Sequence, residues 1–125
     1  DNPDVVVFVA LAGVPDGAEI YFTDSAWTGT EFKTNEGVKK FTAPAGGLSA
    51  GTVFGYGDSL LPHSSSWASA GGTFSLSASG EAIHVYCLDA NTATGQNDIP
   101  YHLSALSYSG GWAQPSPDAS SFTTT

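Results

Sequence analysis

The sequence predicts an all-β fold in which two antiparallel sheets pack as a sandwich of about seven or more short strands. Short apolar runs rich in β-branched and aromatic residues alternate with glycine, serine and threonine, and the 15 glycines are spread along the chain. No segment of about a dozen residues carries apolar positions at helical spacing. We expect the 125 residues to form one domain, with a Pro/Ser/Thr-rich C-terminal tail over about residues 110–125.

The N-terminal half predicts four strands. The apolar run VVVFVALA lies at the centre of the first strand. The segment Pro15-Asp16-Gly17 supplies the turn into the second strand, because proline fixes φ and glycine accepts a positive φ. The glycine-containing segments PAGG and SAG separate the third strand from the fourth. The expected strands span residues 4–12, 18–23, 38–43 and 52–57.

Two long segments interrupt this pattern. Residues 24–37 are polar and carry Trp27 and Phe32, and residues 58–72 carry three consecutive serines and Trp67 without a period of 2 or 3.6. We therefore predict that both segments are long loops.

The C-terminal half predicts a hairpin in which residues 77–80 connect strands 72–76 and 81–89. A polar loop, 89–98, and a last strand, 101–108, follow. In strand 81–89 the two-residue period places Ile83, Val85 and Cys87 on one face and His84, Tyr86 and Leu88 on the other. Cys87 is the sole cysteine, and its place in this apolar run predicts a small buried hydrophobic residue.

The succession EIYFTDSAWTGTEF, NEGVKKFTAPAGGLSAGTVF and TFSLSASGEAIHVY resembles the lamin-tail-like domains of bacterial and algal secreted or surface proteins, over residues 5–108. Those domains are immunoglobulin-like β-sandwiches, so the resemblance implies an immunoglobulin-like fold and an extracellular setting. It carries no catalytic motif and implies a binding or structural module. The terminal SPDASSFTTT departs from the further strand that the resemblance implies.

Charge and composition exclude several partners. The formal net charge is −9, and the only cations are Lys33, Lys39 and Lys40, so a nucleic acid or an anionic membrane surface would meet a repulsive field. No apolar run approaches the ~20 residues of a membrane-spanning helix. The chain begins at Asp1 and contains no methionine, from which we expect a removed leader and a secreted protein.

Signatures of catalysis are missing from the sequence. There is no Gly-x-Ser-x-Gly or His-Glu-x-x-His motif. Glu31 and Glu36, with Asp24 nearby, are candidates for a paired-carboxylate site, but their interpretation as solvated partners of Lys33, Lys39 and Lys40 is favoured over it. We therefore expect a protein that is not an enzyme.

Aromatic residues in loops are the strongest functional signal. An exposed aromatic face stacks on the apolar face of a sugar ring, while short polar side chains bind its hydroxyls. The alternative, that each tryptophan anchors its loop over the end of the sandwich, stays open. The candidate ligand-binding residues are Asp24, Trp27, Glu36, Trp67 and Trp112.

A weak calcium site is the only cofactor that the sequence suggests. Four oxygen-bearing side chains lie within ten residues of one loop, although such residues more often bond to their own backbone in turns. The candidate ligands are Asp89, Asn91, Asn97 and Asp98.

Together these patterns predict a secreted, acidic, non-catalytic module that binds carbohydrate or glycoprotein in the manner of a lectin. The alternative is a structural or adhesive subunit of an extracellular fibre or coat. It rests on residues 5–11, which are apolar on both faces and could support self-association by strand addition. Lys39 and Lys40 are expected to protect another edge of the sheet.

Overall fold

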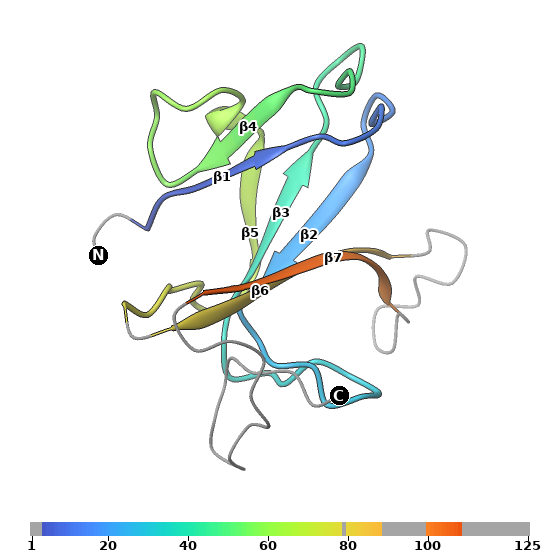
Figure 1. Cartoon of the computed structure of the whole chain (residues 1–125). Helices are drawn as coiled ribbons and strands as arrows, with labels where there is room; N and C mark the ends of the chain where they lie inside the picture. The colour runs from blue at the N-terminus through green and yellow to red at the C-terminus, as the bar shows by residue number, and fades with distance from the viewer. Residues whose placement is uncertain (1–3, 79, 89–99, 109–125) are drawn as a thin grey trace.

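Two antiparallel β-sheets pack against each other in a computed structural model of the chain, which describes residues 4–78, 80–88 and 100–108 (Figure 1). The all-β sandwich predicted from the sequence is confirmed. The smaller sheet pairs β1 with β4, and the larger sheet has the order β5-β3-β2-β6-β7. The strands are β1 Val6–Val9, β2 Glu19–Thr23, β3 Val38–Thr42, β4 Val53–Tyr56, β5 Trp67–Gly71, β6 Glu81–Leu88 and β7 Pro100–Tyr108, with a 3₁₀ turn, η1, at Ser64–Ser66.

Aromatic rings fill the space between the two sheets. Phe41 of β3 is fully buried, and its ring centroid lies 4.6 Å from that of Phe54 on β4. Phe22 of β2 lies 4.7 Å from Phe8 of β1 by the same measure, so each sheet contributes to the same cluster. Removing a buried phenyl ring of this kind typically costs about 3–5 kcal/mol. This cluster therefore holds the two layers together.

Strand β1 alternates in burial although its sequence is apolar throughout. Val6 and Phe8 pack against the core, whereas Val5, Val7 and Val9 are about half exposed on the outer face. The two-residue period of a strand explains the alternation, because successive side chains point to opposite faces. No described residue buries the outer face of β1.

The predicted loop 58–72 is wrong in its last part, because residues 67–71 form β5. Among the described strands it pairs with β3 alone, at the edge of the larger sheet, so four of its five residues are exposed and its sequence shows no apolar alternation. The predicted strand at residues 72–76 is absent in the structure.

The predicted hairpin between strands 72–76 and 81–89 is also wrong. Strand β6 pairs with β2 on one side and β7 on the other. The first four residues of β6 are all buried. Such burial requires a strand that is covered on both faces, whereas a strand of an isolated hairpin exposes one face. Lys39 and Lys40 lie on β3, between β2 and β5, so they do not protect an edge as expected.

Candidate functional site

A hollow of about 640 Å³ lies beside the end of β4 and the start of β5. We call it the Trp67 hollow. Asp4, the segment that follows β4 and the segment that follows β5 complete its lining. Three aromatic side chains, two carboxylates and three serines line it, and its volume lies in the range of roughly 300–1,000 Å³ typical of small-molecule sites. Its lining residues are Asp4, Tyr56, Gly57, Asp58, Ser59, Ser64, Ser65, Trp67 and Phe74.

The backbone after β4 shapes one wall of the Trp67 hollow. Gly57 has a φ of 102°, and a Cβ at this position would lie 1.8 Å from the carbonyl oxygen of Asp4, so only glycine fits. The Asp58 Oδ1 then accepts a hydrogen bond from the Leu60 N–H at 2.8 Å, which closes a local turn. Ser64 Oγ donates to the Ser59 carbonyl at 3.0 Å and joins the two serine segments. These contacts hold the hydroxyl-bearing wall in place.

The aromatic wall is built from three different parts of the chain. The ring of Tyr56, at the end of β4, lies 5.6 Å from that of Trp67 and 5.8 Å from that of Phe74, and the second pair is edge-to-face. The Lys39 ammonium lies 5.1 Å from the centroid of Tyr56, within cation–π range. The hollow therefore combines aromatic surface with carboxylate and hydroxyl groups.

Trp67 does not lie in a loop as the sequence predicted, because it is the first residue of β5. Its ring also contacts the core, with centroids 4.7 Å from Phe22 and 5.1 Å from Phe41. The indole Nε1 is buried and has no acceptor among the described residues. The Trp67 side chain thus packs against the core and also lines the hollow.

Trp27 belongs to a separate group, which we call the Trp27 cluster. It consists of Trp27, Phe32, His84, Tyr86 and His102. The rings of Trp27 and Phe32 lie 4.9 Å apart across an isolated β-bridge, and the Trp27 ring meets that of His102 edge-to-face at 4.5 Å. Residues 24–37 are thereby fixed over the face of β6 and β7 that points away from the smaller sheet. Trp27 is half-buried and anchors its loop, which is the alternative that the sequence left open.

His84 is the most deeply buried histidine of this cluster. The residue is 3% exposed, and burial, followed by the neighbouring charge of His102, lowers its pKa from 6.5 to about 4. Burial raises the pKa of Tyr86 to about 12. Both side chains therefore remain neutral near pH 7.

Asp24 is fully buried and connects three parts of the chain. Its Oδ1 accepts a hydrogen bond from the Gly37 N–H at 2.9 Å, and its Oδ2 accepts one from the Ser75 N–H at 2.8 Å. Desolvation raises the pKa of this carboxyl, and the two backbone donors oppose that shift. Both carboxylate oxygens of Asp24 thus bind backbone N–H groups, and the buried carboxylate has no open face for the ligand that the sequence predicted it to bind.

Of the remaining candidate residues, the structure describes only Glu36, which does not line the Trp67 hollow. Glu36 is half-buried and lies near Asp24, where its charge opposes ionisation of that carboxyl. Trp112 and the candidate calcium ligands Asp89, Asn91, Asn97 and Asp98 lie outside the described residues. Within the described ranges, no group of three or more His, Cys, Asp or Glu side chains could hold a metal ion.

The partners of Trp67 in the hollow were not predicted from the sequence. Tyr56, Asp58 and Phe74 come from segments that the topology brings together, so their spacing along the chain gives no sign of a site. The one local signal is the Gly57-Asp58 pair directly after an aromatic strand end, since this pair marks a turn.

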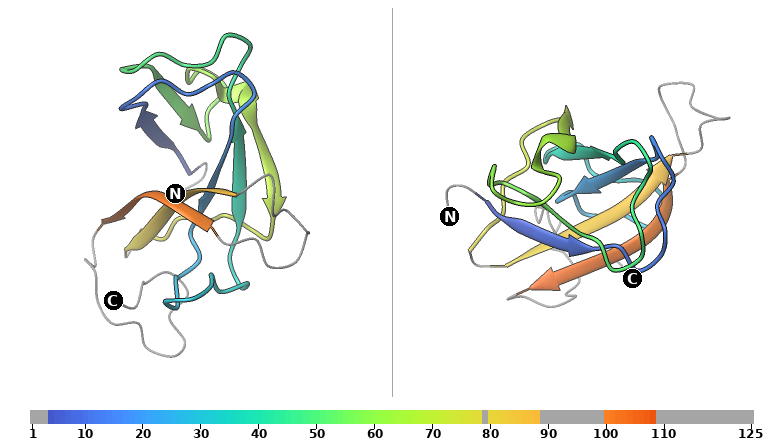
Figure 2. Two further views of the ribbon diagram at one scale, coloured as in Figure 1. Left: turned by 90° about the vertical axis from the view of Figure 1, so that its right-hand side faces the viewer. Right: turned by 90° about the horizontal axis from the view of Figure 1, so that it is seen from above.

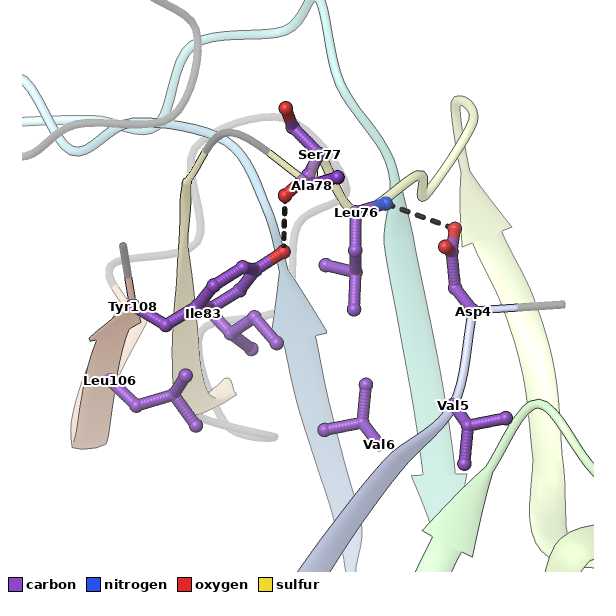
Figure 3. A pocket seen from close by; sticks show the side chains of 9 residues that line it. All are labelled: Asp4, Val5, Val6, Leu76, Ser77, Ala78, Ile83, Leu106 and Tyr108. Atoms are coloured by element: carbon purple, nitrogen blue, oxygen red, sulfur yellow. Dashed lines mark hydrogen bonds between the residues drawn. The ribbon is translucent and has the colours of Figure 1, made fainter. Parts of the chain in front are cut away.

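A second hollow, of about 390 Å³, lies between β1 and β7 (Figure 3). We call it the β1/β7 groove. Val6, Ile83 and Leu106 give it an apolar floor, and the Tyr108 hydroxyl donates a hydrogen bond to the Ser77 carbonyl at 2.8 Å beside it.

Comparisons with known proteins add no relative. A scan against protein-family models, a search of curated proteins and a search of solved structures each gave no match. The resemblance to lamin-tail-like domains therefore stays a prediction. Among the described residues, no helix is long and apolar enough to cross a membrane.

Proposed function

We propose that the chain is a non-catalytic module that binds carbohydrate in the Trp67 hollow. The observation that supports this proposal best is the convergence of the Tyr56, Trp67 and Phe74 rings with carboxylates and serine hydroxyls around one cavity. Aromatic faces stack on the C–H face of a pyranose, and oxygen-bearing side chains bind its hydroxyls. The hollow is the binding site in this proposal, and the Trp27 cluster is a structural anchor.

Two substitutions test the site. Phe74 lies outside the strands, so Phe74→Ala removes one aromatic wall without breaking a sheet ladder. Asp58→Asn keeps an oxygen to accept the Leu60 N–H and removes the charge that would bind a sugar hydroxyl. We expect Asp58→Asn to weaken binding about tenfold or more, because hydrogen bonds to charged groups contribute about 1.5–3 kcal/mol. We expect Phe74→Ala to weaken binding about two- to tenfold, because aromatic contacts contribute about 0.5–1.5 kcal/mol.

The assay is a glycan array followed by titration of the best ligand, with tryptophan fluorescence as the readout. Trp27→Phe is the matched control, because it changes an aromatic residue that does not line the hollow. It should retain both affinity and the fluorescence change. Binding that survives both hollow variants, or an array without any ligand, would contradict the proposal.

The second candidate function is a secreted structural or adhesive subunit, which the outer face of the smaller sheet favours. Val5, Val7 and Val9 are each about half exposed there, and Val53 of β4 lies opposite Val9. Such an apolar face is typical of a protein–protein contact, in this case with a second copy of the chain. Light scattering tests this alternative: self-association should weaken in Val7→Thr, whereas a monomer at all concentrations would refute it.

A further inference from the structure

The Trp67 hollow lies at the end of the smaller sheet where β1 begins and β4 ends, and Figure 2 shows this sheet as a layer apart from the larger one. Its two carboxylates come from Asp4, before β1, and Asp58, after β4. Continued by two residues beyond Val6, the antiparallel β1–β4 register places Asp4 opposite Asp58. The Gly57 backbone approaches the Asp4 carbonyl so closely that a Cβ would overlap it, so the two segments stay adjacent there. This end of the sheet therefore brings two carboxylates to one cavity.

A backbone N–H fixes one oxygen of each carboxylate. The Leu76 N–H donates to Asp4 Oδ2 at 2.9 Å, and the Leu60 N–H donates to Asp58 Oδ1 at 2.8 Å. Asp58 is exposed, and its Oδ2 accepts no hydrogen bond from a described residue. An acceptor that is held in place before binding loses less conformational entropy when a ligand donates to it.

Positive charge is scarce around these carboxylates. Among the described residues, no lysine lines the hollow. The Lys40 ammonium forms an ion pair with Glu19 at 2.6 Å. The Lys39 ammonium lies 5.1 Å from the ring centroid of Tyr56, a lining residue, and opposes part of the negative charge. In a chain with a formal net charge of −9, the two lining carboxylates still favour a cationic ligand over a neutral or anionic one.

The aromatic wall suits the same kind of ligand. The rings of Tyr56, Trp67 and Phe74 line the hollow. The negative face of an aromatic ring attracts a cation, as the contact between Lys39 and Tyr56 illustrates. The same rings stack on the C–H face of a sugar. A ligand that joins an ammonium group to a pyranose ring therefore matches both the rings and the carboxylates.

We propose that the sugar of the carbohydrate function proposed above, on which this inference rests, is a hexosamine with a free, protonated amino group. Its ammonium group has three N–H donors and donates hydrogen bonds to the carboxylates of Asp4 and Asp58. Its hydroxyls meet the serines of the hollow. N-acetylation removes the charge and two of the three donors, and a uronic acid brings a like charge to the carboxylates, so both changes weaken binding.

Four small probes test the proposal on the unaltered protein. They are methyl glucosaminide, its N-acetylated form, methyl glucoside and butylamine, so that the amine and the sugar ring are varied separately. Titration at about pH 6, where the amines are protonated, is followed by NMR through the indole N–H signal of Trp67. Methyl glucosaminide should bind at least about fivefold more tightly than each of the other three probes, and added salt should reduce this preference.

Three variants locate the charge that gives the preference. Asp58→Asn keeps the acceptor for the Leu60 N–H and should reduce the preference for methyl glucosaminide over methyl glucoside at least about threefold. Lys39→Gln removes the opposing charge and should strengthen binding of methyl glucosaminide. Asp16→Asn is the matched control, because it removes one charge from an exposed residue that does not line the hollow and should leave the preference unchanged. An equal reduction in Asp16→Asn and Asp58→Asn would assign the preference to net charge alone and overturn the proposal.

The outcomes separate this inference from the carbohydrate function on which it rests. Equal affinity for the three glycosides would overturn the amine preference and leave the carbohydrate site in place. Butylamine that binds as tightly as methyl glucosaminide would overturn both, because the sugar ring would then contribute nothing. If none of the probes shifts the Trp67 signal, the amine preference is refuted, and the glycan array decides separately whether the hollow binds another sugar.

Discussion

The carboxylate of Asp24 makes the sharpest prediction about stability. Replacing Asp24 with alanine leaves the N–H groups of Gly37 and Ser75 without their acceptors. A buried polar group left unsatisfied costs about 1–3 kcal/mol, so two such groups give roughly 2–6 kcal/mol. Removing a desolvated charge offsets part of this cost, since desolvation already raises the pKa of Asp24. We expect Asp24→Ala to lose about 2–4 kcal/mol of the free energy of unfolding.

Asparagine at the same position separates charge from hydrogen bonding. Asp24→Asn keeps one oxygen acceptor, places an NH₂ group opposite the second N–H, and removes the buried charge. Since burial disfavours the charged form, we expect this variant to lose only about 1 kcal/mol. The order of stability should therefore be wild type, Asp24→Asn, Asp24→Ala.

Urea unfolding followed by far-UV circular dichroism measures both losses. Asp16→Asn is the control, because Asp16 is an exposed acidic residue in a turn and should change stability by less than about 0.5 kcal/mol. An Asp24→Ala variant within about 0.5 kcal/mol of wild type would refute the structural role. A variant that keeps its stability but loses sugar binding would restore Asp24 as a ligand residue.

Three further predictions concern other parts of the fold. The pKa of His84 is about 4 in the folded protein and 6.5 in the unfolded chain, so its contribution to stability is fully present above pH 6.5 and falls as the pH drops, by about 2 kcal/mol at pH 4.5. His84→Gln should remove this pH dependence from the free energy of unfolding measured between pH 4.5 and 6.5. Gly57→Ala should cost more than about 2 kcal/mol by urea unfolding, whereas Gly51→Ala, with a φ of 87° and open space around it, should cost about 1 kcal/mol, and equal losses would contradict the close approach to Asp4. Burial raises the pKa of the Cys87 thiol, so iodoacetamide at pH 8 should alkylate it at least about tenfold more slowly in the native protein than in urea, and equal rates would show that the thiol is not packed.

Strand β6 shows what the sequence could predict. The two-residue period assigned Ile83, Val85 and Cys87 to one face, and all three contribute to the core or pack against it. The order of strands in the larger sheet could not be obtained in this way, because the partners of β6 are set by burial on both its faces and not by the nearest turn. Local periodicity determines faces, whereas neighbours depend on long-range packing.

The candidate site shows the same limit. Trp67 could be singled out from its sequence context, but its strand could not, because an exposed edge strand such as β5 carries no apolar alternation. Asp24 was attractive as a ligand because it lies near Trp27, and the structure places its acceptors against backbone donors 13 and 51 residues away. Contacts at that separation are determined by topology and leave no mark in local spacing.

The position of Asp24 also links the Trp67 hollow to acid titration. Ser75, whose N–H binds Asp24, directly follows Phe74, which lines the hollow. A ligand that immobilises Phe74 favours the arrangement in which Asp24 holds that backbone, and by reciprocity protonation of Asp24 changes the affinity of the ligand. For the ligand site proposed above, affinity and proton uptake would thus be linked through Asp24, a carboxylate that does not line the hollow.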